Sequence, residues 1–175
     1  MMGTHIDFNS ITASAAAIAA VASLIALILT YFQLKQFRFA HGVDLIFELE
    51  DRFDAPEMMK ARKVVAKALQ KRTSVQEMDT VLDFFETLGI LVRRHAVDKE
   101  LAWNSFSYWV LRYAVFTRDH IDARRRAESD NTYWEEFEFL VDCFTQVETR
   151  KRHLKLPQSF SNVQLDKFLK EELSD

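Results

Sequence analysis

The longest apolar stretch of the chain lies near its N-terminus. Residues 11–32 contain no charged side chain and are rich in alanine, leucine and isoleucine. A helix rises about 1.5 Å per residue, so this stretch is long enough to cross a hydrocarbon core of roughly 30 Å. The pattern therefore predicts a transmembrane helix over residues 11–32, preceded by a short extracytoplasmic N-terminus at residues 1–10.

The residues that flank this stretch predict its orientation. Lys35 and Arg38 follow it, whereas Asp7 is the only charged residue before it. Basic residues are retained on the cytoplasmic side of a membrane, which predicts an N-terminus outside and a C-terminal domain in the cytoplasm. A cleaved signal peptide is the main alternative, but no Lys or Arg precedes Lys35 and the small residues come before the apolar block rather than after it.

Small side chains recur at four-residue spacing within this predicted membrane helix. The positions that share the spacing are Ala15, Ala19, Ala22, Ser23 and Ala26. Such positions let two helices approach closely, so they indicate self-association or packing against another membrane protein. An alanine-rich helix that faces only lipid is the alternative interpretation.

The rest of the chain has the periodicity of helices. Apolar positions recur three or four residues apart, without the alternation that indicates strands. The pattern predicts a juxtamembrane helix over residues 33–53 and a helical domain over residues 54–175, with helices at 56–71, 75–94, 99–128, 133–152 and 162–173. Only three glycines and two prolines occur in the 175 residues, which also favours long helices. The predicted fold class is all-α, with one transmembrane helix that continues into a cytoplasmic bundle of about five helices.

Short polar residues mark the predicted helix starts. Asp54, Ser74, Thr132 and Ser161 each precede an acid or amide by three residues, which is the arrangement of a capping box. Asp98 is a fifth predicted cap, without the reciprocal acid. These five residues are therefore expected to begin the helices of the domain.

Two charged residues are isolated among apolar neighbours. Arg112 interrupts the nearly continuous apolar stretch at residues 106–116, and Glu86 lies within the sequence Phe-Phe-Glu-Thr-Leu at residues 84–88. An unpaired buried charge is costly, so these two residues are predicted to form a buried ion pair. The pair is interpreted as structural, with a functional site as the alternative.

Composition and motifs argue against several classes of function. A formal net charge of −3 does not favour nucleic acid as a partner. The glycines stand alone, which excludes phosphate loops and dinucleotide fingerprints, and the five histidines lack the spacing of helical metal sites. Cys143 is interpreted as a small apolar residue. No cofactor, metal or catalytic residue is therefore predicted, and the chain is not expected to be an enzyme.

Four phrases of the sequence resemble a known protein family. They are Phe-Asp-Ala-Pro-Glu-Met at residues 53–58, Asp-Phe-Phe-Glu-Thr-Leu-Gly at 83–89, Leu-Val-Arg-Arg at 91–94 and Tyr-Trp-Val-Leu-Arg-Tyr at 108–113. Together they resemble a bacterial family of unknown function, whose members are short proteins with one N-terminal membrane helix and an α-helical tail. The resemblance implies the same fold and a place in the bacterial inner membrane, but it supplies no catalytic residue.

The predicted function is that of a membrane-anchored interaction or accessory protein, which docks on or stabilises a membrane protein complex. The small-residue face, the aromatic-rich domain and the missing catalytic motifs agree with this hypothesis. A membrane-anchored regulatory or sensory module is one alternative. An enzyme with an unrecognised site around Glu86, Arg112 and His120 is the other. The predicted partners are the lipid bilayer and either another membrane protein or a second copy of the chain.

Overall fold

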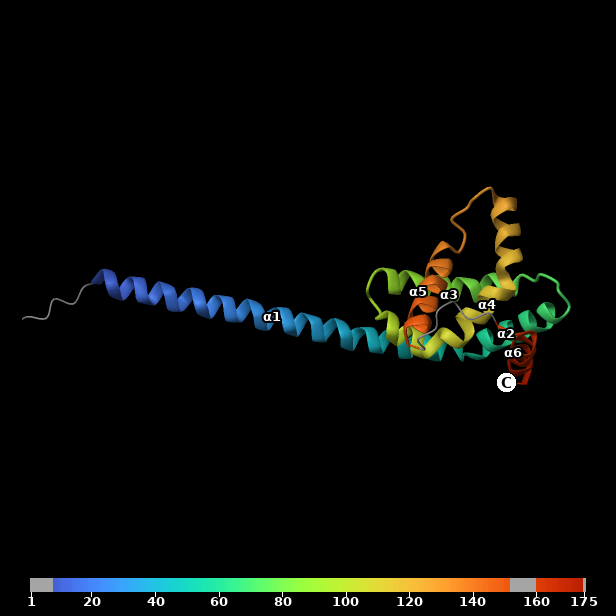
Figure 1. Ribbon diagram of the computed structural model, residues 1–175, viewed down its shortest axis with the longest axis horizontal. Coiled ribbons are helices and arrows are strands. Elements are labelled where there is room, and N and C mark those ends of the chain that lie inside the picture. The colour runs from blue at the N-terminus through green and yellow to red at the C-terminus, as the bar shows by residue number, and fades with distance from the viewer. Residues whose placement is uncertain (1–7, 152–159, 175) are drawn as a thin grey trace, which may run out of the picture. The chain divides into compact units, whose positions relative to one another are not determined.

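Six α-helices make up the described part of the chain. The computed structural model describes residues 8–151 and 160–174, and for residues 8–20 and 38 it describes the backbone alone. The helices are α1 (Phe8–Phe53), α2 (Pro56–Gln70), α3 (Glu77–Arg93), α4 (Lys99–Glu128), α5 (Glu135–Lys151) and α6 (Asn162–Ser174) (Figure 1). No strand occurs in these residues, so the all-α prediction is confirmed.

The chain divides into two units, Met1–Ala40 and His41–Asp175. The first unit contains the N-terminal part of α1. Among the described residues, no helix combines the length and the apolar character needed to cross a membrane. The transmembrane helix expected at residues 11–32 is therefore not supported, and the side chains of residues 11–20 lie outside those that the structure describes. The second unit includes the last turns of α1, which the sequence assigned to the juxtamembrane helix.

Buried aromatic side chains form the centre of the second unit. The ring centroids of Phe53 and Phe84 lie 5.0 Å apart, and that of Phe85 lies 5.7 Å from Tyr113 and 5.8 Å from Phe137. Each of these five side chains is at most 2% exposed. They come from α1, α3, α4 and α5, so burial of large rings joins four helices in one core.

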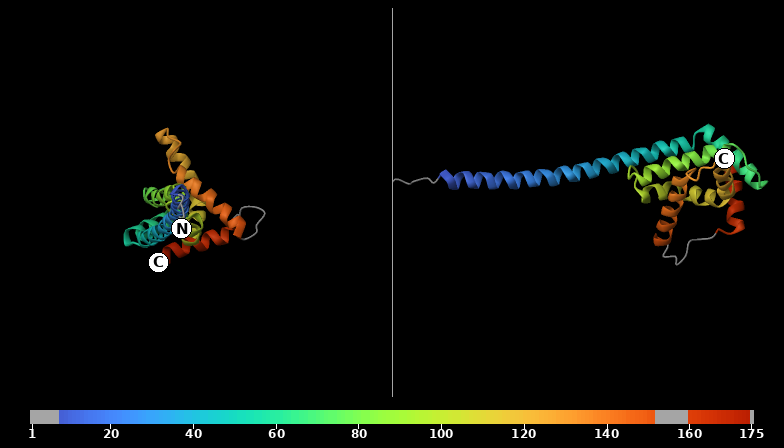
Figure 2. Two further views of the ribbon diagram at one scale, coloured as in Figure 1. Left: turned by 90° about the vertical axis from the view of Figure 1, so that its left-hand side faces the viewer. Right: turned by 90° about the horizontal axis from the view of Figure 1, so that it is seen from above.

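Helix α3 contacts more of the other helices in this unit than α2, α4, α5 or α6 does. It packs against α2, α4 and α5, while α2 also packs against α6 and α4 against α5. Figure 2 shows the same helices gathered together in two further views. A Cβ atom at Gly89 of α3 would lie 2.2 Å from the carbonyl oxygen of Glu136 on α5. The glycine therefore permits a backbone contact between these helices that no larger residue would allow.

Two helix caps are formed as the sequence predicted. The Asp98 carboxylate accepts hydrogen bonds from the N–H groups of Glu100 and Leu101, at 2.8 and 3.1 Å. The Ser161 hydroxyl accepts from the N–H of Gln164 at 3.3 Å, and the Gln164 side chain accepts from the N–H of Ser161 at 2.9 Å. Local sequence alone identified these starts because both partners lie within three residues.

The caps expected at Asp54, Ser74 and Thr132 are not formed. Helix α2 begins after Ala55, which makes no capping bond through its side chain. The hydroxyl of Ser74 is bonded to His120 of α4 instead of a helix N–H. The hydroxyl of Thr132 donates to a carboxylate in its own loop. Short polar side chains have several possible hydrogen-bond partners, and Ser74 and Thr132 bond to groups other than a helix N–H.

Candidate functional site

The described residues in the N-terminal part of α1 expose many apolar side chains. Every large apolar side chain from Val21 to Phe39 is 49–70% exposed. We refer to residues 21–39 as the apolar segment of α1. Successive residues of a helix turn by about 100°, so these side chains face all directions. Full burial of one such side chain is worth about 1.5–3 kcal/mol, which makes this segment a strong candidate for contact with an apolar environment.

The residues predicted to pack within a membrane fall into two groups. Those with described, exposed side chains are Ala22, Ser23 and Ala26, together with the flanking Lys35. Those whose side chains lie outside the described residues are Ala15, Ala19 and Arg38. The packing role of these small residues therefore stays a prediction.

Glu86 and Arg112 have separate partners, and the ion pair expected between them is absent from the contacts of the described residues. The Glu86 carboxylate accepts a 2.7 Å hydrogen bond from the N–H of Phe137, near the start of α5. Burial raises the pKa of Glu86 in spite of this hydrogen bond. An acid of α3 thus caps α5, where the helix dipole favours negative charge.

Arg112 makes cation–π contacts with two aromatic rings. Its guanidinium lies 3.7 Å from the ring centroid of Tyr108 and 4.8 Å from that of Phe160. One of its nitrogen atoms also donates to the carbonyl oxygen of Tyr108 at 2.7 Å. Cation–π contacts can accommodate a partly buried guanidinium. Tyr108 lies one helical turn before Arg112, whereas Phe160 reaches Arg112 only in the folded chain, and the sequence did not indicate that contact.

Arg62 and Glu172 form a buried ion pair that the sequence did not reveal. The Nη2 and Nε atoms of Arg62 lie 2.7 and 3.0 Å from the two carboxylate oxygens of Glu172, and the two residues are 5% and 4% exposed. The indole of Trp109 and the hydroxyl of Tyr113 donate to the same carboxylate at 3.1 and 2.7 Å. Burial alone would lower the pKa of Arg62, but the hydrogen bond and charge of Glu172 outweigh it and raise that pKa. The network joins α6 to α2 and α4.

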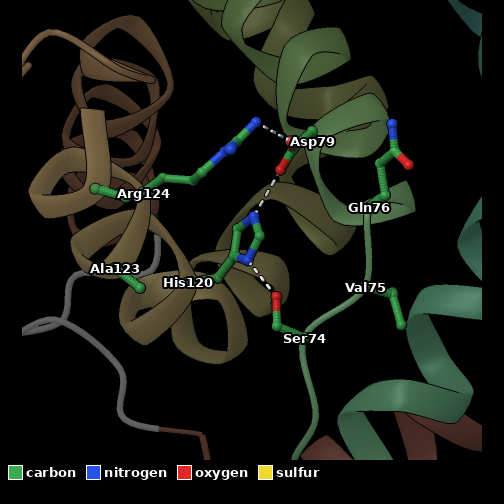
Figure 3. A pocket seen from close by; sticks show the side chains of 8 residues that line it. Ser74, Val75, Gln76, Asp79, His120, Ala123 and Arg124 are labelled. Carbon is green, nitrogen blue, oxygen red and sulfur yellow. Dashed lines mark hydrogen bonds and ion pairs between the residues drawn. The ribbon is translucent and has the colours of Figure 1, made fainter.

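A second polar cluster lines a cavity at the surface of the bundle (Figure 3). The Ser74 hydroxyl oxygen lies 2.6 Å from Nδ1 of His120, and Nε2 of His120 lies 2.7 Å from one oxygen of Asp79. The second oxygen of Asp79 accepts from Nη2 of Arg124 at 2.9 Å. Hydrogen bonds therefore link the four side chains in a row, from the hydroxyl of Ser74 to the guanidinium of Arg124.

The turn between α2 and α3 places Ser74 in this cluster. Arg72 adopts a left-handed conformation with φ of 53°. Thr73 then bonds back to the carbonyl oxygen of Ala68 through its N–H at 2.9 Å and its hydroxyl at 3.2 Å. These bonds close the end of α2 and direct the chain toward α4. The acid of the cluster comes from the first turn of α3, while its histidine and arginine come from adjacent turns of α4.

The direction of the hydrogen bonds follows from the chemistry of the groups. An ionised carboxylate only accepts, so the ring N–H of His120 is the one that faces Asp79. In the neutral ring Nδ1 is then an acceptor, and the Ser74 hydroxyl donates to it. The His120 side chain is only 11% exposed, and its ring centroid lies 5.6 Å from that of Trp134. The imidazole is thus fixed with its basic nitrogen toward a hydroxyl group.

Two cavities meet at Ser74 and His120. One has a volume of about 530 Å³ and is also lined by Gln76, Asp79 and Arg124. The other has a volume of about 480 Å³, and its apolar wall consists of Leu69, Met78, Val115 and Phe116. A small molecule in contact with the Ser74 hydroxyl would therefore have polar groups on one side and an apolar wall on the other.

Metal-ligand groups and the cysteine are two further features of the described residues. Within residues 8–151 and 160–174, no group of three or more His, Cys, Asp or Glu side chains is arranged to hold a metal ion. Cys143 is a free, partly buried cysteine, and burial raises the pKa of its thiol. A raised pKa leaves less of the reactive thiolate at neutral pH.

Sequence analysis missed the Ser74 cluster because its members are far apart along the chain. His120 is separated from Asp79 by 41 positions and from Ser74 by 46. The enzyme alternative did include His120, but it combined this residue with Glu86 and Arg112, which have the separate partners described above. No local motif links the true members, so only the packing of α3 against α4 brings them together.

The comparison with known proteins gives a family but no activity. No curated protein and no solved structure gives a significant match to the chain. Residues 13–143 match the profile of a family described as "Domain of unknown function (DUF4760)". The match covers more than half of the 175 residues and agrees with the resemblance to a family of unknown function. The chain therefore belongs to the DUF4760 family of domains of unknown function.

Proposed function

We propose that the chain is a membrane-anchored interaction protein, and that the N-terminal part of α1 is its anchor. The observation that carries the proposal is the exposure of every large apolar side chain from Val21 to Phe39. A lipid bilayer fits this segment best because lipid contacts a helix on all sides at once. One packed helix would cover a single face only.

The sequence around the apolar segment supports the same proposal. Residues 11–32 carry no charge, and their helical length of about 33 Å is close to the roughly 30 Å of a bilayer core. Lys35 and Arg38 follow the uncharged stretch, which favours a cytoplasmic location for the second unit and an N-terminus outside. The proposed location is the bacterial inner membrane, which is also the location that the resemblance to a bacterial family implies.

Fractionation of cells that express the full chain tests the anchor. We expect the chain to stay in the membrane pellet after an alkaline carbonate wash. Replacing both Val21 and Leu24 with aspartate should release it, because each acid near the centre of the 11–32 span costs about 3 kcal/mol. Val163→Asp is the matched control, since this residue is 78% exposed on α6 and lies outside the anchor. A wild-type chain that is soluble and monomeric contradicts the proposal.

A partner within the membrane is the second part of the proposal. Ala22 and Ala26 lie one turn apart on the apolar segment, and small residues at this spacing permit close contact between helices. We expect Ala22→Leu to reduce cross-linking of the full chain to itself or to a co-purifying membrane protein. Val21→Leu adds bulk on a neighbouring position and should leave cross-linking unchanged. Equal cross-linking in both variants would show that this face contacts lipid alone.

A further inference from the structure

The Ser74 hydroxyl has an unusual partner for a serine that precedes a helix. A capping serine accepts a hydrogen bond from a helix N–H, whereas this hydroxyl lies 2.6 Å from the basic nitrogen of His120. Both this distance and the 2.7 Å from the ring to Asp79 fall within the reach required of general acid–base partners. Ser74 is also exposed at the cavity. The hydroxyl is therefore accessible and paired with a base at the same time.

We propose that this cluster hydrolyses carboxylic esters, with Ser74 as the nucleophile and His120 as the general base. Asp79 is a positioning residue, because it holds the N–H of the imidazole and so keeps Nδ1 free to accept a proton. The same logic operates in hydrolases on unrelated folds, where a hydroxyl, an imidazole and an acid act in series. This activity goes beyond membrane anchoring and does not depend on it.

The reaction needs no other reagent than water. The oxygen of Ser74 attacks the ester carbonyl carbon while its proton moves to Nδ1 of His120. The tetrahedral intermediate then breaks its bond to the alcohol oxygen, which leaves with that proton, and an acyl-serine remains. Water attacks the acyl-serine and gives a proton to Nδ1. The serine oxygen leaves, takes this proton back, and the products are a carboxylic acid and an alcohol.

The start of α3 supplies donors for the negative charge that develops on the carbonyl oxygen. The first backbone bonds of this helix are donated by Met78 and Asp79, to the carbonyl oxygens of Val75 and Gln76 at 3.1 and 3.0 Å. The N–H groups that precede them lie at the positive end of the helix dipole and have no acceptor within the helix. Val75 and Gln76 also line the cavity next to Ser74. Backbone N–H groups beside a nucleophile are the usual means of stabilising an oxyanion.

The two cavities indicate which part of the ester lies where. The acyl chain fits the cavity of about 480 Å³, where Leu69, Met78 and Phe116 provide an apolar wall. The alcohol fits the cavity of about 530 Å³, where Gln76 and Arg124 can donate hydrogen bonds. The substrate class is therefore an ester of a short apolar acid with a polar alcohol.

Covalent labelling and hydrolysis by the full chain in detergent micelles test the proposal together. A fluorophosphonate probe should modify Ser74, as located by mass spectrometry, and the chain should hydrolyse p-nitrophenyl butyrate. Ser74→Ala should abolish both labelling and hydrolysis. His120→Gln should lower kcat by about 10²- to 10⁴-fold, the usual contribution of a general base. Ser129→Ala removes an exposed serine after α4 and should leave kcat unchanged.

Asp79→Asn separates positioning from a merely structural role. The variant should lower kcat at least tenfold, since the ring would no longer be held in the reactive tautomer, while KM and the unfolding temperature stay close to wild type. A wild-type chain that neither reacts with the probe nor hydrolyses esters of two- to eight-carbon acids would overturn the proposal. Hydrolysis that persists in Ser74→Ala would overturn it as well. Labelling of the wild-type chain needs no variant, so a failure of Ser74→Ala to fold would not affect that result.

Discussion

The ion pair between Arg62 and Glu172 should be the polar contact on which the stability of the bundle depends most. Glu172→Gln removes the charge and keeps the shape, so the buried guanidinium of Arg62 would keep only the exposed carboxylate of Asp54, 3.7 Å away, as a counter-ion. Both side chains are buried, at 5% and 4% exposure, and the Arg62 nitrogens lie 2.7 and 3.0 Å from the carboxylate. Removing one partner of such a pair typically costs about 3–5 kcal/mol.

The expected change in unfolding temperature follows from this figure. For a chain of 150–250 residues, a loss of 1 kcal/mol lowers the unfolding temperature by about 2–4 °C, so Glu172→Gln should lower it by about 6–20 °C. Arg62→Met should cause a loss of similar size. The double variant should lose less than the sum of the two, because no uncompensated charge remains and glutamine still offers an acceptor to Trp109 and Tyr113.

Thermal unfolding of the full chain in detergent micelles, followed by circular dichroism, measures these changes. The control is Lys167→Met, because Lys167 and Glu171 form an exposed ion pair on the same helix, with side chains 75% and 43% exposed. Such surface pairs contribute little, so the control should unfold near the wild-type temperature. Additive effects of Glu172→Gln and Arg62→Met, each no larger than that of the control, would refute the assignment of a buried, coupled pair.

Three further predictions test the fold in the same assay. Gly89→Ala would place a Cβ 2.2 Å from a backbone carbonyl oxygen of α5 and should cost about 1–3 kcal/mol or more, whereas Gly42→Ala meets its nearest atom at 3.0 Å and should cost less; equal effects would contradict the close contact. Burial raises the pKa of Glu86 above its ordinary value of 4.5, so the folded state binds a proton more tightly than the unfolded state does. The contribution of Glu86 to the free energy of unfolding is therefore lost as the pH rises above 4.5. Glu86→Gln keeps an acceptor without the charge, and it should match wild-type stability near pH 4 and equal or exceed it at pH 7; a large loss at pH 7 would contradict this. Asp98→Ala should cost about 1 kcal/mol through loss of a helix cap, and Asp98→Asn should recover most of it; an equal loss in both would show that the cap bonds contribute nothing.

The helices of the second unit follow closely from the local sequence. The helix predicted at residues 99–128 is α4 (Lys99–Glu128), and the one predicted at 56–71 differs from α2 (Pro56–Gln70) by one residue. The reason is that helical periodicity and capping depend on residues only three or four positions apart. The caps at Asp98 and Ser161 were found for this reason, since each bonds within its own first turn.

The contacts between side chains of different helices depend on how the helices pack in the folded chain. Arg62 and Glu172 are 110 positions apart, Glu86 and Phe137 are 51 apart, and Ser74 and His120 are 46 apart. Periodicity shows which face of a helix is apolar, but it does not show which face of another helix will cover it. Glu86 and Arg112, the two charges that stand among apolar residues, are only partly buried, while the buried charges Arg62 and Glu172 have no such pattern around them. The polar clusters depend on helix packing that no local pattern encodes.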